Sequence, residues 1–201
     1  MFRREHEQWE TTYPITAAVR DLKHMDIAVQ SAVPTIFLMC GDILTVKECV
    51  DKAKDANKKI YLHVDLIKGL ANVKEGIMYL AKECQPDGIV TTKTQLIKAA
   101  KEAGLTAIQQ VFLFDTQAYH TALKNINKSE PDAVEMMPAL MPRVIEEFTA
   151  AVQQPVIAGG LIQSQGEIEA ALEAGANAVT IGNPAMWEID ISKSKGRQRY
   201  A

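Results

Sequence analysis

Eight short apolar runs, rich in β-branched residues, alternate along the chain with longer amphipathic stretches. Apolar side chains on both faces of such a run are typical of a parallel strand that helices cover. The runs are the weak first one, Pro14–Val19, and then Pro34–Cys40, Lys59–Leu66, Asp87–Thr91, Leu105–Phe114, Asp132–Met137, Pro155–Ala158 and Asn177–Ile181. Regular alternation of strand and helix predicts a parallel sheet with right-handed crossovers.

The amphipathic stretches between the runs predict helices. They cover Val46–Ala56, Val73–Cys84, Gln95–Ala103, Ala118–Ile126, Val144–Val152 and Gly166–Ala174. Gly104 and Gly175 each stand between a helix and the next strand, where glycine commonly ends a helix. Eight units of about 25 residues predict an α/β fold, a compact (β/α)8 TIM barrel at the lower end of its size range. The alternative is an open doubly wound sheet, but no G-x-G-x-x-G follows the first strand.

The chain of 201 residues reads as a single domain. Area scaling predicts that about 70% of its surface is buried on folding, which is enough for one core without disulfides. No linker or repeat divides residues 1–191, which we assign to the barrel. The basic segment 192–201 lacks apolar periodicity, and we expect it to be a disordered C-terminal tail.

Charge and cysteine usage narrow the class of protein. The net charge of −3 gives no sign of a strong nucleic-acid or membrane binder. Cys40, Cys49 and Cys84 form no C-x-x-C pair, so we expect reduced, buried thiols. No signal peptide or long apolar stretch is present, which predicts a soluble cytoplasmic protein. No metal-ligand spacing emerges, and we expect neither a metal nor a cofactor.

Candidate site residues are sought at the carboxyl ends of the strands, where ligands bind in this fold. Alternation in the third strand places Tyr61, His63 and Asp65 on the inward face, with Asp65 nearest the mouth. His63 is interpreted as a satisfied core histidine, and Asp65 as either a site residue or a structural one. Thr92 is expected to cap a helix, which would place Lys93 in the first turn, against the helix dipole. Lys93 either pairs with Asp65 or is an exposed lysine without a role.

The sixth strand carries one charge among apolar neighbours. Glu135 shares a face with Ala133 and Met137 and is expected to point toward the mouth, although it could instead anchor a buried ion pair. Asp115, after the fifth strand, is interpreted as a helix N-cap.

Glycines end the last two strands and suggest a phosphate site. Gly159, Gly160 and Leu161 follow the seventh strand, and Gly182 and Asn183 follow the eighth. Glycine lets backbone N–H groups approach a ligand, and loops after strands seven and eight form the common phosphate site of this fold. Pro184–Glu188 fits a short helix there. Tight turns without a ligand are the alternative.

Taken together, these segments resemble the GlpP family, the glycerol uptake operon antiterminator regulatory proteins. The resemblance runs from about the second strand to Trp187, and the H-V-D-L-I-x-G-L segment is its specific part. The matching segments are His63–Leu70, Asp87–Lys93, Ala107–Asp115, Pro131–Pro138, Ile157–Ile162 and Gly175–Val179, with Asn183 and Trp187 beyond.

The resemblance implies a TIM barrel that senses glycerol 3-phosphate, or a similar small phosphorylated polyol, and acts on a leader mRNA. By position, the phosphate would be held by Gly159, Gly160, Leu161, Gly182 and Asn183. The polyol pocket would be lined by Asp65, Lys93, Gln110 and Glu135. Two departures stand out: Gln109-Gln110 replaces Gln-Arg, which removes a bidentate guanidinium, and Met137-Pro138-Ala139 replaces Leu-Pro-Gly.

Two classes of function are therefore open. A ligand-gated regulator needs an RNA surface, and RNA binding rests on the resemblance alone, since the visible basic cluster is the tail with Lys193, Lys195, Arg197 and Arg199. The alternative is an isomerase, aldolase or lyase acting on a small phosphorylated metabolite, with Asp65, Lys93 and Glu135 as acid, base or Schiff-base groups. No nucleophile–base pair emerges, so no catalytic residue is assigned. A homo-oligomer stays open.

Overall fold

The computed structural model describes residues 13–191, and its eight parallel strands close into a barrel in the order β1 to β8. The strands are β1 (Ile15–Val19), β2 (Thr35–Leu38), β3 (Lys59–His63), β4 (Gly88–Thr91), β5 (Thr106–Phe112), β6 (Ala133–Met137), β7 (Val156–Gly159) and β8 (Ala178–Ile181). The predicted TIM barrel is confirmed and the open sheet is excluded, because β8 pairs with β1 through Thr16 and Thr180. The predicted tail, 192–201, lies outside the described residues.

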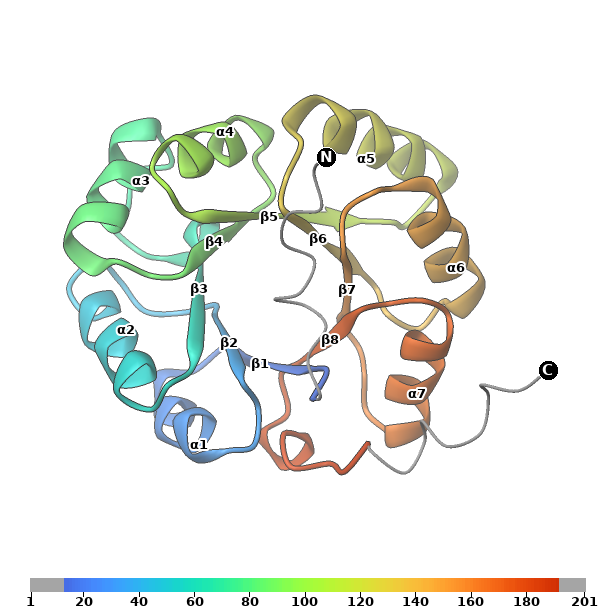
Figure 1. Ribbon diagram of the computed structural model, residues 1–201, viewed down its shortest axis with the longest axis horizontal. Coiled ribbons are helices and arrows are strands. Elements are labelled where there is room, and N and C mark those ends of the chain that lie inside the picture. Colours follow the sequence, from blue (N-terminus) through green and yellow to red (C-terminus); the bar gives the residue numbers. More distant parts are fainter. Residues whose placement is uncertain (1–12, 192–201) are drawn as a thin grey trace, which may run out of the picture.

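Seven α-helices surround the described barrel (Figure 1). They are α1 (Met25–Gln30), α2 (Val46–Asp55), α3 (Lys74–Tyr79), α4 (Thr94–Glu102), α5 (Thr116–Ser129), α6 (Pro142–Ala151) and α7 (Gln165–Glu173). Short 3-10 turns, η2 (Leu22–His24), η3 (Val64–Leu66) and η5 (Pro184–Met186), and a π-helical turn, η4 (Leu80–Cys84), complete the connections. The sequence pattern predicted six of the seven α-helices but missed α1, which has only six residues and buries only Met25 and Ala28.

Local chemistry explains several helix ends. Asp115 caps α5, as predicted, by accepting a hydrogen bond from the N–H of Ala118 at 2.6 Å. A capping box begins α7 at Ser164. Gly104 and Gly175 follow α4 and α7 with φ angles of +78° and +100°, which confirms their predicted role in ending these helices.

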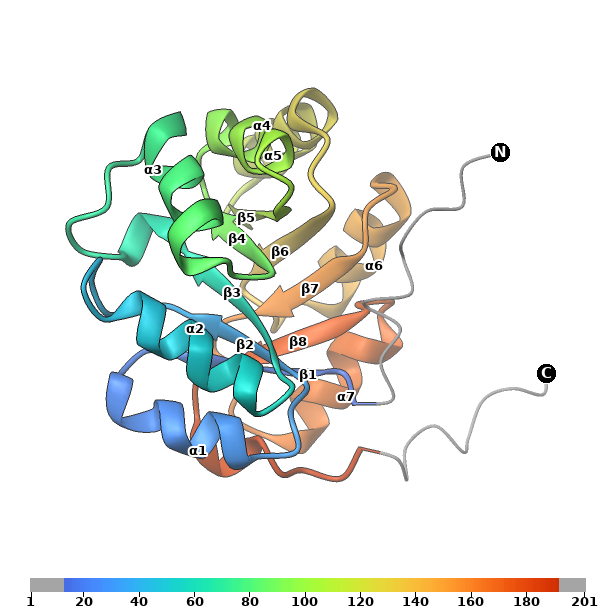
Figure 2. The ribbon, with the colours of Figure 1, turned by 60° about the vertical axis from the view of Figure 1, so that its left-hand side comes forward.

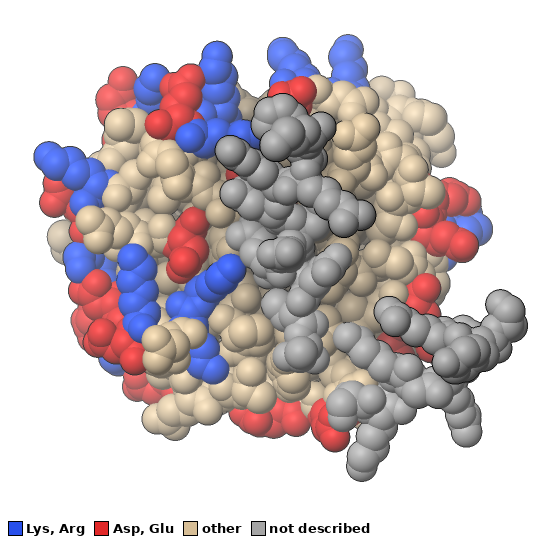
Figure 3. Space-filling view, in the orientation of Figure 1, with Lys and Arg blue, Asp and Glu red and all other residues tan. Residues whose placement is uncertain are grey.

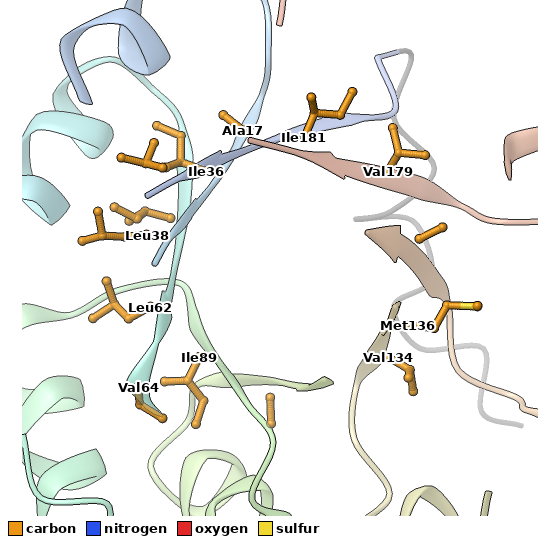
Figure 4. Packing of buried hydrophobic residues seen from close by; sticks show 14 of the residues in the cluster. Ala17, Ile36, Leu38, Leu62, Val64, Ile89, Val134, Met136, Val179 and Ile181 are labelled. Carbon is orange, nitrogen blue, oxygen red and sulfur yellow. The ribbon is translucent and has the colours of Figure 1, made fainter. Parts of the chain in front are cut away.

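The core forms two layers. Outward-facing strand residues such as Ile36, Leu62 and Met136 extend toward the surrounding helices (Figure 4). A separate cluster fills the barrel interior: Phe37, Tyr61, Val90, Ile108, Ala133, Ile157 and Ala178. Beyond this cluster, a cavity opens at the carboxyl ends of the strands. In Figure 2 the arrowheads, and therefore the mouth of the barrel, point to the left.

Charges of both signs are mixed on the opposite end of the barrel, where the strands begin (Figure 3). Over α4, lysines lie next to acidic residues, and the ion pair between Lys74 Nζ and Glu102 Oε2 measures 2.7 Å. Cys49 and Cys84 are buried free thiols, as expected, whereas Cys40 is partly exposed. In the part of the chain that is described, no helix is long and apolar enough to cross a membrane.

Candidate ligand-binding site

A cavity of about 930 Å³ opens at the carboxyl ends of the strands. Every strand or the loop after it contributes to its wall. The wall includes Arg20, His63, Asp65, Gln110, Gly160 and Gly182. Leu161, Thr180 and Asn183 also line it, whereas Gly159, Lys93 and Glu135 do not. The structure therefore brings together most of the residues that the sequence singled out.

The turn after β7 has an unusual backbone. Gly160 and Leu161 are consecutive residues in the left-handed region, with φ angles of +82° and +66°. For leucine this conformation costs about 1–2 kcal/mol, and strain of this kind is concentrated at functional sites. Leu161 is also 66% exposed, so burial of its side chain does not compensate for the strain.

Gly159 has a different role from the one expected. It is buried within β7, and a Cβ there would collide with Thr180 Oγ1 and lie 2.9 Å from Glu135 Oε1. Glycine at this position therefore makes room for a buried pair of polar side chains below the cavity. Contact between Gly159 and a phosphate stays an untested prediction.

The segment after β8 contributes Gly182 and Asn183. Asn183 Oδ1 accepts a hydrogen bond from the N–H of Ala185 at 3.2 Å and thereby caps η5. The expected helix Pro184–Glu188 is only this three-residue 3-10 turn. A short turn has a small dipole, so its end adds little to anion binding.

Arg20 is a site residue that the sequence interpretation missed. It follows β1 directly, is exposed, and approaches Gly182 closely: a Cβ on Gly182 would lie 3.4 Å from Arg20 Cδ. Within residues 13–191, no carboxylate forms an ion pair with Arg20. Its position at the carboxyl end of the first strand, in register with inward-facing Thr16 and Ala18, was the signal that could have identified it.

Asp65 joins the ends of β3 and β4. Its Oδ1 accepts from Thr91 Oγ1 at 2.9 Å, and its Oδ2 accepts from the N–H and the hydroxyl of Thr92 at 2.7 and 2.8 Å. Burial acts to raise the pKa of Asp65, but these hydrogen bonds outweigh it and lower the pKa below its usual value. Asp65 is thus an ionised anchor whose acceptor sites are largely occupied.

The expectations for Thr92 and Lys93 need correction. Thr92 does not cap a helix, because its hydroxyl is bonded to Asp65. α4 begins at Thr94, with Lys93 itself at the N-cap position rather than in the first turn. Lys93 Nζ lies 3.7 Å from Asp65 Oδ1, so the pairing of these two side chains is present, although Lys93 stands outside the cavity wall.

Glu135 lies at the centre of a buried relay of side chains. It is fully buried and accepts from Thr180 Oγ1 at 2.6 Å and from Gln110 Nε2 at 2.7 Å. Gln110 Oε1 in turn lies 3.0 Å from His63 Nε2. Burial raises the pKa of Glu135, and the hydrogen bonds and nearby His63 only partly oppose this effect. Glu135 points inward as expected but is covered, so it reaches the cavity only through its partners.

The register of the barrel explains why Gln110 meets Glu135. The two residues are directly opposite each other on β5 and β6, whereas Gln109 faces outward and bonds Ser129. Where the family resemblance leads us to expect an arginine, this chain therefore places a neutral amide against its buried carboxylate. The second departure, Ala139, is buried, and its N–H donates to the carbonyl of Gly160 at 3.3 Å.

Comparisons with known proteins match this chain to a described family and to a curated relative. Residues 15–187 match a family described as glycerol-3-phosphate responsive antiterminator. The chain is 34% identical over 176 residues to the uncharacterized protein YgcP of Escherichia coli, covering 88% of this chain and 92% of YgcP.

Two solved structures are also similar. The glycerol uptake operon antiterminator regulatory protein of Listeria monocytogenes is 32% identical, with a TM-score of 0.85 over 88% of this chain and 96% of that one. A glycerol uptake operon antiterminator-related protein of Thermotoga maritima is 27% identical, with a TM-score of 0.76 over 89% and 100% of the two chains. Several enzymes among more distant structures share only the fold, at identities of 11% to 18%.

Proposed function

Because the chain belongs to the glycerol-3-phosphate responsive antiterminator family, we propose that it binds glycerol 3-phosphate, or a similar small phosphorylated polyol, at the barrel mouth. We further propose that this binding controls its action on the leader mRNA of glycerol-utilisation genes. The observation that carries the proposal is the different lining of the two sides of the cavity. Glycine-containing turns lie on one side, with an arginine that forms no ion pair among the described residues, and hydrogen-bonding side chains lie on the other.

The phosphate end is assigned to Gly160, Leu161, Gly182 and Asn183, together with Arg20. A phosphate needs donors and positive charge, and a guanidinium can bind two of its oxygens at once. Arg20 supplies the charge without a competing ion pair among the described carboxylates. The left-handed turn at Gly160 and Leu161 places a residue without a side chain in the cavity wall, where a ligand can approach the backbone.

The polyol end is assigned to the opposite wall, with Asp65 and Gln110. These two residues line the cavity directly. Lys93 contributes by pairing with Asp65, and Glu135 contributes by holding the Gln110 amide. The cavity volume of about 930 Å³ lies within the range of small-molecule sites, about 300–1,000 Å³.

A thermal-shift panel tests ligand binding. Glycerol 3-phosphate at 100 times its Kd adds about 2.7 kcal/mol to the free energy of unfolding. For a domain of this size, that corresponds to a rise in Tm of about 5–10 °C. Glycerol and inorganic phosphate, each carrying half of the chemistry, should produce smaller shifts. A panel of phosphorylated polyols and sugars without any shift would contradict the proposal.

Action on RNA and catalysis are separated by two further measurements. We expect glycerol 3-phosphate to strengthen binding to the leader RNA in a gel-shift assay, with an affinity that falls as salt is added. Binding that is absent or insensitive to salt would contradict the RNA part alone. Conversion of the phosphorylated ligand into product, abolished by Lys93→Ala, would instead support an enzyme.

A further inference from the structure

One buried nitrogen at the barrel mouth lacks a partner. His63 is 3% exposed and lines the cavity, yet its Nδ1 makes no hydrogen bond. Among the described buried side chains, only Asn72 Oδ1 shares this condition. An unsatisfied buried polar atom costs about 1–3 kcal/mol, so such atoms are rare and usually have a reason. Because the His63 ring forms part of the cavity wall, a bound molecule can supply the missing partner.

The relay behind His63 determines which chemical character Nδ1 has. The Glu135 carboxylate accepts hydrogen bonds, so the Gln110 amide must turn its NH₂ group toward it, as the 2.7 Å contact shows. The Gln110 carbonyl oxygen therefore faces His63 Nε2, and that nitrogen must carry the proton. Protonation of Glu135 on Oε1 preserves this polarity, because the Thr180 hydroxyl can accept as well as donate.

A proton on Nε2 leaves Nδ1 of a neutral imidazole as a bare acceptor. Such an atom requires a donor and disfavours a phosphate oxygen, which is itself an acceptor. A hydroxyl group is the part of a polyol phosphate that can donate. The relay thus favours one orientation of the ligand, with its hydroxyl end toward β3 and β5 and its phosphate toward Arg20.

We propose that His63 Nδ1 accepts a hydrogen bond from a hydroxyl of the bound polyol phosphate, in the tautomer that Glu135 imposes through Gln110. This inference rests on the proposed function, since it assigns the hydroxyl-reading group of the same site. His63 is then a specificity-determining residue that distinguishes a polyol phosphate from an alkyl phosphate of the same length. Glu135 and Gln110 are positioning residues, because they act through the imidazole.

The first test compares glycerol 3-phosphate with propyl phosphate, which has the same carbon chain and no free hydroxyl. Wild-type protein should bind glycerol 3-phosphate more tightly. His63→Gln keeps a group where Nε2 lies and removes Nδ1, so it should weaken glycerol 3-phosphate about 3- to 10-fold and leave propyl phosphate unchanged. His63→Asn keeps a polar group near Nδ1 and should recover part of the difference. His120→Gln, on the exposed surface of α5, is the matched control and should change neither affinity.

The second test reads the tautomer directly in the free protein. In ¹⁵N NMR of histidine-labelled protein, a protonated ring nitrogen and a bare one resonate far apart, and His63→Gln assigns the signal. We expect a proton on Nε2, and a shift of the Nδ1 signal when glycerol 3-phosphate is added. In Glu135→Gln the amide of residue 110 is free to turn, so the preference for the Nε2 tautomer should weaken.

The outcomes separate this inference from the proposed function. If wild-type protein binds glycerol 3-phosphate but His63→Gln does not alter its preference over propyl phosphate, the inference is overturned and the proposed function stands. A proton on Nδ1 in the free wild-type protein overturns the inference in the same way. If neither phosphate binds wild-type protein, both the proposed function and the inference fail.

Discussion

The wall of the mouth in the turns after β7, β8 and β1 is built differently from the hydrogen-bonded wall on β3, β5, β6 and β8. The first, which we call the glycine wall, consists of Gly160, Leu161, Gly182 and Asn183 with Arg20 beside them. The second, the relay wall, consists of His63, Gln110, Glu135 and Thr180, which are hydrogen-bonded in a chain. Glycines interrupt the side-chain lining of the glycine wall, whereas hydrogen-bonded side chains form the relay wall, with Glu135 covered behind them.

This difference separates affinity from selectivity. Backbone groups and a guanidinium suit any phosphate, because they respond to charge and to a compact shape. Donors and acceptors held in a fixed chain respond to the hydroxyl pattern, since a mismatched ligand leaves a buried polar atom unpaired. Variants of the glycine wall should therefore weaken all phosphorylated ligands alike, and variants of the relay wall should change the preference among them.

The largest expected effect is a loss of stability in Gly159→Ala, at the position where the two walls meet. The added Cβ would collide with Thr180 Oγ1 and crowd Glu135, so the buried chain must shift. Overpacking together with a broken buried network should lower the free energy of unfolding by about 3 kcal/mol or more, measured by urea denaturation.

Gly166→Ala is the matched control, because nothing lies within 4 Å of a Cβ at that position in α7. Its stability should be unchanged or raised by up to about 1 kcal/mol. Equal stabilities for the two variants would show that Gly159 does not make room for the relay.

Gly160→Val should have the next largest effect, on both folding and binding. A β-branched residue at a φ of +82° is strained, which should cost about 1–2 kcal/mol of stability. The same substitution narrows the approach to the turn, and calorimetry should show affinity for every phosphorylated ligand reduced more than about 10-fold, or 1.4 kcal/mol.

Gly104→Val is the control that separates the loss of stability from the loss of affinity. Gly104 has a φ of +78° and open space around it, but it ends α4 far from the mouth. We expect a similar loss of stability and unchanged affinity. If both variants bind normally, the assignment of the phosphate end to Gly160 is wrong.

These contrasts also show how far the sequence could predict the molecule. Strand periodicity, the cap at Asp115 and the glycines at Gly104 and Gly175 depend on neighbouring residues, and the structure confirms them. α1 was missed because it is short and buries only two side chains, whereas the equally short α3 continues into η4 and so forms a longer amphipathic stretch. Thr92 was assigned to a cap because its partner Asp65, 27 positions earlier, is invisible to local patterns.

The sequence predicted the relay wall only in part, for the same physical reason: its contacts join residues that are far apart in the chain. Alternation placed Glu135 inward, but only the register of β5 against β6 sets Gln110 opposite it. The close approach of Gly159 to Thr180 depends on the register of β7 against β8, in which the two residues are directly opposite each other. Arg20 was overlooked because the first strand has the weakest apolar pattern of the eight.

A smaller effect is expected from Arg20→Gln, which removes the positive charge of the glycine wall. Because Arg20 is exposed, water and salt screen its field, and affinity for glycerol 3-phosphate should fall about 3- to 10-fold at low salt and less at high salt. Titration at two ionic strengths measures this change. Arg143→Gln, an exposed arginine of α6 paired with Glu147, is the control. Identical affinities for the two variants would remove Arg20 from the site.

The smallest expected effects are on the pH dependence of stability. The contributions of Glu135 and Asp65 to stability should change in opposite directions as the pH rises. The raised pKa of Glu135 means that the folded state holds its proton more tightly, so its contribution is complete below the usual value of 4.5 and is lost as pH rises through the folded pKa. The lowered pKa of Asp65 means that its contribution is present above the usual value of 3.8 and is lost as pH falls through the folded pKa.

Urea denaturation of Glu135→Gln and Asp65→Asn across this pH range reads both signs. Relative to wild type, Glu135→Gln should gain stability as the pH rises, because wild type alone bears the burial of an ionising carboxyl. Asp65→Asn should be at its greatest disadvantage at neutral pH, where the ionised carboxylate accepts from Thr91 and Thr92, and should approach wild type in acid. Curves of the same sign for both variants would contradict the opposite pKa shifts of the two carboxylates.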